Sequence, residues 1–415
     1  MWKKGGILFS ILAAMLLAAC GESSGDDGQV ELELFSNKTE NIGTYESLIE
    51  KFEEEHPNIT VELYAPPEAE TILRTRLVKD DMPDMLAIAG SALYGELADA
   101  GILKDYGILK DYIESGLIED IQPAYLEMLA DLTEEETAGT YGVPYATNAN
   151  TVIYNKEKFE ELGVEPPETW DEFIEILEKA KGEGETPIYF TLQEAWTGMI
   201  AWNAVAGNLE PEQFAQKKNN DEASFQQDYQ ETADKMLTLL EYDHDRTFGI
   251  GYDDGNNAFA NGEGVIYLQG NWAVPELLEV NPDLDLGVFP IPVTNEPEEN
   301  DLVSGVDVLF ATLEESEHPE EAQLFIDFML EEENMKQYTD EQAAFPALEG
   351  VYEDDPALEG IRENFEEGRI TSFPDHYYPP GIGAENLIQE FYIQKDKEQF
   401  LQKMDNEWEK VERRY

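Results

Sequence analysis

Cysteine, histidine and basic residues are scarce in this 415-residue sequence, and each shortage excludes a class of protein. The single cysteine, Cys20, excludes an internal disulfide bond. None of the four histidines pairs with another at the spacing of zinc ligands, which argues against a dedicated zinc carrier. Only 26 lysines and arginines face 91 aspartates and glutamates, and the formal net charge of -65 disfavours binding to nucleic acid or anionic lipid through a basic face.

Motifs of common catalytic and metal sites are also missing. The sequence contains neither a glycine-rich phosphate loop of the P-loop type nor a Gly-x-Ser-x-Gly elbow. The acidic stretches 243–245 and 253–257 hold hard oxygen donors, but the second lacks the spacing and the terminal glutamate of an EF-hand loop. A solvated turn is therefore favoured over a metal site. We expect a protein that is not an enzyme and needs neither cofactor nor metal.

Despite its acidity, the chain has enough apolar residues to fold around a core. Hydrophobic residues make up 42% of the sequence and aromatic residues 11%, which is typical of globular proteins and not of disordered ones. The carboxylates must therefore lie mostly on the surface, where their mutual repulsion opposes folding unless counterions screen it. We expect a halophilic protein or one from an alkaline habitat.

The N-terminal residues have the features of an export signal. Lys3 and Lys4 precede an apolar stretch, Gly5–Ala19, that is too short to span a membrane. Leu17–Cys20 resembles the lipobox of bacterial lipoproteins, in which cleavage leaves a lipidated cysteine. We expect a signal peptide at 1–19, a lipid on Cys20 and a flexible tether at 20–28 that holds the protein at the outer face of the cell membrane. The alternative is a buried free cysteine in an ordinary signal anchor.

Length and hydrophobic periodicity predict two α/β domains. The part of the chain after the tether exceeds what one hydrophobic core usually serves. Segments with the two-residue period of strands alternate with segments of helical period, an order typical of a mostly parallel sheet covered by helices. The expected strands are 30–35, 59–63, 85–89, 151–154, 188–191, 264–268, 286–289 and 306–311. The expected helices include 45–52, 69–78, 92–100, 157–162, 320–330, 397–411 and one that starts with a capping box at Thr169 and Glu172.

Several segments resemble a known family in their order and spacing. The most similar are Tyr141–Tyr145, Val152–Lys156 and Pro166–Phe173, and further matches follow at 83–103, 259–272, 289–292 and 322–330. Together they resemble the sugar-binding proteins of bacterial ABC importers, the type 1 extracellular solute-binding proteins that include the maltose-binding and multiple-sugar-binding proteins. Each segment is weak evidence alone, and their colinearity makes the resemblance specific.

The resemblance implies an α/β fold of two lobes, like that of periplasmic binding proteins. A ligand cleft lies between the lobes, and hinge strands cross from one lobe to the other near 148–151, 304–307 and 368–372. Lobe 1 is expected to comprise 29–147 and 304–368, and lobe 2 to comprise 148–303 and 369–415. The implied function is to bind an oligosaccharide, close around it and deliver it to the permease subunits of an ABC transporter. We expect a monomer.

A sugar site needs aromatic platforms for the apolar C–H faces, and carboxylates and amides for the hydroxyl groups. By their position in the resemblance, the expected platforms are Trp196, Trp272 and either Tyr377 or Tyr378. The alternative for each tryptophan is a place in the core. The expected hydrogen-bonding residues are Asn37, Glu40, Ser91, Asn148, Glu194, Gln269, Asn271 and Asp307.

Two other functions remain open at this stage. An extracellular glycoside hydrolase would also place tryptophans and paired carboxylates around a sugar, but no pair stands out among so many carboxylates. A noncarbohydrate solute such as a polyol phosphate would need arginines, and none lies in a segment assigned to the site. A neutral ligand is therefore favoured. The strand at 85–89 lacks the aromatic residue of the maltose-binding protein, which puts a maltodextrin in doubt.

Overall fold

The structure is a computed structural model, which describes residues 29–39, 41–67, 69–79, 81–106, 121–133, 139–348, 356–379 and 381–413. The expected signal peptide and tether, including Cys20, lie outside these ranges, and so does Glu40. Across the described residues, no helix combines the length and the apolar character needed to cross a membrane.

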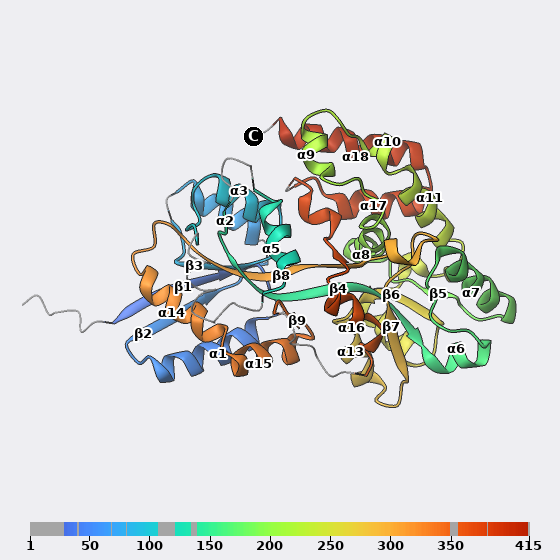
Figure 1. Cartoon of the computed structure of the whole chain (residues 1–415), viewed down its shortest axis with the longest axis horizontal. Coiled ribbons are helices and arrows are strands. Elements are labelled where there is room, and N and C mark those ends of the chain that lie inside the picture. Colours follow the sequence, from blue (N-terminus) through green and yellow to red (C-terminus); the bar gives the residue numbers. More distant parts are fainter. Residues whose placement is uncertain are drawn as a thin grey trace, which may run out of the picture.

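The first half of the molecule, at the left of Figure 1, holds one end of the sheet. Strand β1 pairs in parallel with β2 and with β3, and β3 pairs antiparallel with β8. The apolar side of β1 and the face of α1 that carries Tyr45, Leu48 and Phe52 are fully buried. The main elements here are β1 (Val30–Ser36), α1 (Ile42–Glu55), β2 (Ile59–Tyr64), α2 (Ala69–Leu77), β3 (Met85–Ile88), α3 (Ala92–Asp99), α5 (Pro123–Ala130), β8 (Leu302–Thr312), α14 (Pro319–Met329) and α15 (Glu332–Gln342).

The second half, at the right of Figure 1, packs helices around the other end of the sheet. Strand β6 pairs antiparallel with β4 and in parallel with β5, and β7 pairs with β4. The predicted capping box is confirmed, because Thr169 and Glu172 exchange hydrogen bonds at the start of α7. The main elements are β4 (Val143–Asn155), α6 (Lys156–Leu162), α7 (Trp170–Glu183), β5 (Ile188–Tyr189), α8 (Ala195–Ala206), α9 (Phe214–Asn219), α10 (Phe225–Asp228), α11 (Gln230–Leu239), α12 (Tyr252–Ala260), β6 (Ile266–Gly270), α13 (Ala273–Val280), β7 (Leu286–Phe289), α17 (Ala384–Gln394) and α18 (Lys397–Glu412).

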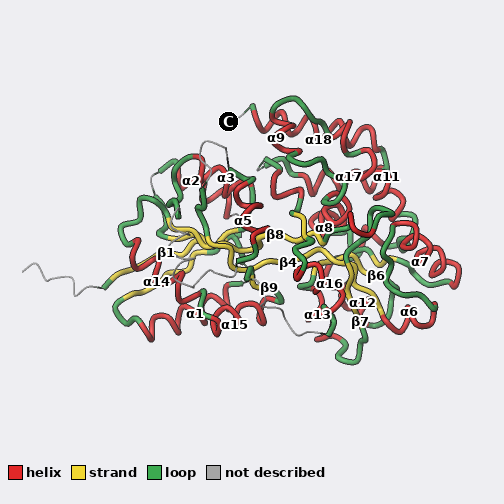
Figure 2. Tube along the Cα trace, viewed as in Figure 1, coloured by secondary structure: helices red, strands yellow, loops and turns green. Residues whose placement is uncertain are grey.

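Two long strands, β4 and β8, connect the halves, and both run through the centre of the molecule (Figure 2). The first part of β4 pairs with β8, and its last residues pair with β6 and β7. The short strand β10 (Ile370–Thr371) joins the start of β8. The predicted α/β fold, with two lobes and crossover strands, is therefore the observed architecture.

One helix near the C-terminal crossover packs closely against the second half. Helix α16 (Glu359–Glu366), expected in lobe 1, packs against β7 of the second half. Gly360 allows this approach, because a Cβ atom at that position would lie only 2.0 Å from the carbonyl oxygen of Val288. Apolar residues Ile361 and Phe365 are buried in the same cluster as Val288. The close approach at Gly360 therefore packs α16 directly against β7.

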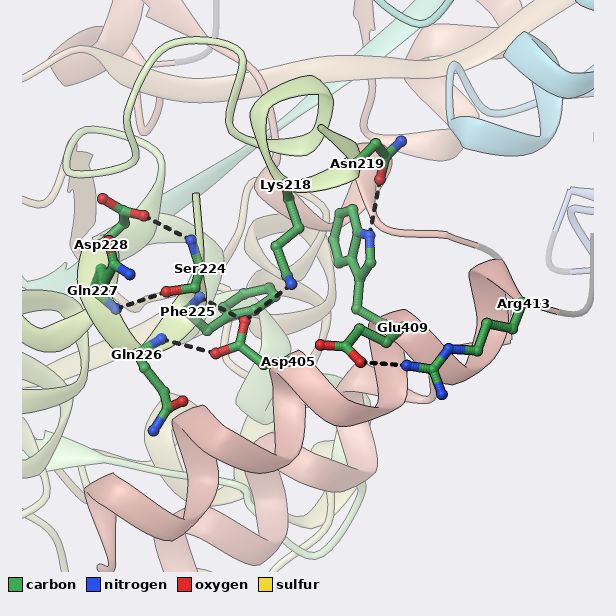
Figure 3. Close-up of polar contacts among 11 residues, drawn as sticks. Lys218, Asn219, Ser224, Phe225, Gln226, Gln227, Asp228, Asp405, Glu409 and Arg413 are labelled. Carbon is green, nitrogen blue, oxygen red and sulfur yellow. Dashed lines mark hydrogen bonds and ion pairs between the residues drawn. The ribbon is translucent and has the colours of Figure 1, made fainter. Parts of the chain in front are cut away.

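Helix α18 is fastened to the second half by a buried carboxylate. Asp405 accepts hydrogen bonds from the backbone N–H groups of Phe225 (2.9 Å) and Gln226 (3.1 Å), and Lys218 Nζ lies 3.3 Å from Asp405 Oδ1 (Figure 3). The side chains of Lys218 and Asp405 are only 7% and 10% exposed. Charges buried this deeply are tolerated because they are paired and hydrogen-bonded.

Replacing Asp405 with alanine is expected to lower the free energy of unfolding by about 3–5 kcal/mol, because it leaves the Lys218 ammonium and two N–H groups buried without a partner. Urea denaturation monitored by tryptophan fluorescence measures the loss. A control on the same helix is Glu409→Ala, which removes only the exposed pair with Arg413 (Figure 3) and should cost at most about 1 kcal/mol. Equal losses in the two variants would contradict the assignment.

Candidate functional site

A cavity of about 720 Å³ lies between the two halves of the molecule. The first half contributes Lys38 and Asn41 near the end of β1 together with residues 341–344 at the end of α15. The second half contributes residues at the starts of α8, α12 and α13, and the crossover strands contribute Asn148 and Asp307. The lining residues are Lys38, Asn41, Asn148, Trp196, Tyr252, Trp272, Pro275, Glu276, Glu279, Asp307, Glu341, Gln342, Ala343 and Ala344.

Two aromatic rings form one part of the cavity wall. Trp196 is 42% exposed, and its ring centroid lies 5.0 Å from that of Tyr252. The carboxylate of Glu194 accepts a hydrogen bond of 2.7 Å from the Tyr252 backbone N–H group. Glu194, predicted to contact the ligand, therefore holds the start of α12 in position behind these rings. Such a large exposed tryptophan next to a second ring is a surface on which a sugar face can stack.

Trp272 forms the other aromatic part of the wall. It lies two residues after the end of β6, and its indole ring folds back over Gly270, where a Cβ atom would lie 1.9 Å from the ring. Only glycine at this position leaves room for the ring. The aromatic wall is therefore defined as Trp196, Tyr252 and Trp272.

Charged and amide groups from three strand regions form the floor of the cavity. Lys38 Nζ lies 2.5 Å from Asp307 Oδ1, and the Asn148 amide donates a 2.9 Å hydrogen bond to the same oxygen. The side chains of Lys38 and Asp307 are 17% and 18% exposed, so the pair is accessible from the cavity and shielded from bulk water. We call Lys38, Asn148 and Asp307 the polar floor.

The electrostatics of the cavity disfavour an anion. The lysine of the polar floor is already paired with Asp307. Three further carboxylates, on Glu276, Glu279 and Glu341, line the wall, and no lysine or arginine among the described residues forms an ion pair with them. Burial raises the pKa of the Glu276 carboxyl above its usual value. A phosphate or carboxylate ligand would therefore meet repulsion, and a neutral polyhydroxylated ligand would not.

His376 lies beside the polar floor and was not among the predicted residues. Its Nδ1 atom is buried and has no hydrogen-bond partner, and its ring centroid is 4.9 Å from that of Phe373. Burial lowers the pKa of the imidazole, so the neutral form with a free acceptor nitrogen is favoured. With Ser91 and Asp375, it lines a second cavity of about 410 Å³ between the halves. The sequence signal was present, since Tyr377 and Tyr378 were chosen from the same loop.

Four of the predicted site residues, Asn148, Trp196, Trp272 and Asp307, line the cavity between the halves. Ser91 lies at the smaller cavity instead. Tyr378 also lines that cavity, although it is only 4% exposed and its hydroxyl group is hydrogen-bonded to Trp202 and Tyr229 in the core of the second half. Asn37 has an unpartnered buried Oδ1 atom, but it is not part of the cavity lining.

Gln269 and Asn271 are only 1% exposed, and the structure places neither in the lining of the cavity. The Gln269 amide donates to the Thr191 hydroxyl group. The Asn271 side chain accepts a hydrogen bond from the Ala149 N–H group and donates one to the Ala343 carbonyl oxygen. In the part of the chain that the structure describes, no three histidine, cysteine, aspartate or glutamate side chains form a group that could hold a metal ion.

Tyr377 lines a third cavity, of about 550 Å³, which is bordered by α5, β10 and the segment before α9. Glu210 lies in the same lining, and burial raises the pKa of its carboxyl group to about 8, with nearby Asp375 adding to the shift. The Tyr229 hydroxyl group donates a hydrogen bond to this carboxyl. Glu210 is therefore protonated at neutral pH.

Glu210→Gln is expected to stabilise the protein at pH 9 and to leave it nearly unchanged at pH 4.5. Because the pKa of Glu210 is higher in the folded than in the unfolded state, its contribution is complete below pH 4.5 and is lost as the pH rises to about 8. The gain at pH 9 should be roughly 2–5 kcal/mol, since each pKa unit corresponds to about 1.4 kcal/mol. Urea denaturation at pH 4.5, 7 and 9 checks this. Glu212→Gln, in the same cavity, is the control, and parallel pH profiles for Glu210→Gln and wild type would contradict the prediction.

Comparison with known proteins identifies the family. The family model of the bacterial extracellular solute-binding proteins matches residues 36–336. The chain belongs to this family. The match begins at the last residue of β1 and includes β4, β8 and every residue of the aromatic wall and the polar floor.

Two curated relatives of this solute-binding protein cover most of its length. The multiple sugar-binding protein of Streptococcus mutans is 30% identical over 376 residues, which are 85% of this chain and 84% of that protein. The melibiose/raffinose/stachyose-binding protein MelE of Bacillus subtilis is 23% identical over 393 residues, 90% of this chain and 88% of that one.

Solved structures agree with the fold of this solute-binding protein. The binding protein RafE in complex with raffinose is 26% identical, has a TM-score of 0.72 and matches 92% of this chain and 100% of RafE. The apo form of RafE, from Streptococcus pneumoniae, has a TM-score of 0.73 and the same identity over 93% and 99%. MsmE of Bacillus subtilis, in an open conformation, has a TM-score of 0.81 at 19% identity over 94% and 99%, which supports the fold alone.

Proposed function

We propose that this protein binds a neutral oligosaccharide in the cavity between its lobes and delivers it to the permease of an ABC importer. The observation that carries the proposal is the aromatic wall that faces the polar floor across one cavity. Apolar C–H faces of a sugar stack on Trp196 and Trp272, and its hydroxyl groups replace water on Lys38, Asn148 and Asp307. Closure of the lobes then signals occupancy to the permease.

The names of the relatives suggest which sugars to try first. MelE is named for melibiose, raffinose and stachyose, and RafE was solved with raffinose. A cavity of about 720 Å³ lies within the usual range for sites that enclose small ligands, which is roughly 300–1,000 Å³. We therefore propose an oligosaccharide of this group as the ligand.

The remaining parts of the proposal concern the location of the protein. We propose that Cys20 carries a lipid anchor and that the protein acts as a monomer on the outer face of the cell membrane. The support is the lipobox-like Leu17–Cys20 and the polar tether at 20–28. Mass spectrometry of the native membrane fraction would detect the lipid on an N-terminal Cys20, and an unmodified thiol there would contradict the anchor.

A thermal-shift screen of mono- and oligosaccharides in high salt tests the function. A ligand that binds only the folded state stabilises it by about 2.7 kcal/mol at a hundred times its dissociation constant, so the melting temperature must rise. We expect a rise with raffinose or stachyose and none with a sugar phosphate. Chromatography of the recovered sugar separates a binding protein from a glycoside hydrolase, because the binding protein returns its ligand uncut. A shift with sugar phosphates alone, or with no sugar at all, would contradict the proposal.

A further inference from the structure

Asn271 connects the two lobes at the edge of the cavity. It directly follows β6 in the second half. Its Oδ1 atom accepts a 2.7 Å hydrogen bond from the N–H group of Ala149 on the crossover strand β4. Its Nδ2 group donates to the carbonyl oxygen of Ala343, directly after α15 in the first half. One buried amide therefore ties lobe 2 to a crossover strand and to lobe 1.

The Asn271 side chain is buried between groups of both halves. The residue is 1% exposed and is absent from the cavity lining, and its side chain is hydrogen-bonded within the protein. Two residues next to Asn271 do line the cavity. Trp272 follows Asn271 in the chain, and Ala343 accepts its hydrogen bond. Ala343 has a left-handed backbone, with φ of +48°, which a residue other than glycine adopts at a cost. The amide thus holds the left-handed turn at Ala343 to the residue that precedes Trp272.

We propose that Asn271 is a positioning residue that sets the angle between the lobes and so the distance between Trp272 and the polar floor. Without its donor group, the end of α15 and the end of β6 are no longer held together, and the lobes sample a wider range of angles. The consequence for sugar affinity rests on the proposed function, but the consequence for the lobe angle does not.

The sharpest test is Asn271→Asp, which changes one donor to an acceptor with almost no change in shape. The aspartate keeps an oxygen for the Ala149 N–H group but places its second oxygen against the Ala343 carbonyl oxygen, where the two repel. The matched control is Asn150→Asp. Asn150 is 4% exposed and donates to the Ile200 carbonyl oxygen, a bond from β4 to α8 within the second half. Both variants lose one buried amide donor, and only the first loses a bond between lobes.

Small-angle scattering without sugar should give a larger radius of gyration for Asn271→Asp than for wild type and for Asn150→Asp. Raffinose or the best sugar of the screen should bind Asn271→Asp roughly tenfold or more weakly, mainly through faster dissociation, while Asn150→Asp keeps wild-type affinity. The uncharged Asn271→Ser serves if the aspartate prevents folding, and it should change both quantities in the same direction. Scattering curves identical to wild type for the Asn271 variants would overturn the proposal. If wild type binds no sugar, the proposed function fails and the scattering still decides the role of Asn271.

Discussion

Replacing Trp272 with alanine is expected to abolish the rise in melting temperature that the oligosaccharide causes. The Trp272 ring packs over Gly270 and lines the cavity, so it offers a flat apolar face in a fixed position. Truncating such a central aromatic residue typically costs about 2–4 kcal/mol of binding free energy, a factor of roughly thirty to a thousand in affinity. Calorimetric titration and thermal shift measure the loss.

A matched tryptophan outside the cavity provides the control for Trp272. Trp170, at the start of α7, is half-buried and stacks under the Lys235 ammonium at 4.1 Å. Trp170→Ala should lower the melting temperature of the free protein and leave the sugar-induced rise intact. Trp272→Phe should retain part of the affinity, because a smaller ring still stacks. Full binding by Trp272→Ala would show that this residue is not a platform.

Adding salt is expected to raise the melting temperature of the wild-type protein steeply. The formal net charge of -65 opposes a compact state, and the screening length falls from about 10 Å at 0.1 M salt to about 3 Å at 1 M. The rise between 0.05 M and 1 M sodium chloride should be roughly ten degrees or more, since about 1 kcal/mol shifts the melting temperature by 2–4 °C in a domain of about 150–250 residues.

The shape of the salt response separates screening from a general salting-out effect. Screening acts mainly below about 0.5 M, whereas exclusion of salt from the protein surface grows roughly in proportion to concentration. We therefore expect most of the rise in the first 0.5 M, and potassium chloride should act like sodium chloride. A melting temperature that does not change across this range would contradict both the repulsion argument and the proposed salty habitat.

Much of the fold could be predicted because periodicity and local signals report on burial. The strand β1 and the helix α1 show their periods plainly, and the capping box at Thr169 needs only residues close in sequence. The packing partner of α16 could not be predicted, because its amphipathic pattern says that one face is buried but not against which element. That choice depends on the close contact between Gly360 and Val288, which are far apart in sequence.

The candidate site could be predicted only in part, for a similar reason. Residue type and resemblance point to Trp196 and Trp272, and the structure brings both into one cavity. Lys38 could not be chosen, because nothing local distinguishes a lysine beside Asp307 from a surface lysine. Asn271 is an amide at the end of a strand, as expected of a residue that binds sugar hydroxyl groups. Its side chain is instead hydrogen-bonded to the backbone of Ala149 and of Ala343. Such competition between internal and ligand hydrogen bonds is visible only in three dimensions.

The crystal structure of the protein grown with raffinose or the best sugar of the screen tests the central claim most directly. We expect electron density for a sugar between the lobes, with one ring against Trp272 or Trp196 and hydroxyl groups within hydrogen-bonding distance of Lys38 and Asp307. Density for the sugar elsewhere on the molecule, or an empty cavity in crystals of a protein that binds the sugar in solution, would contradict it.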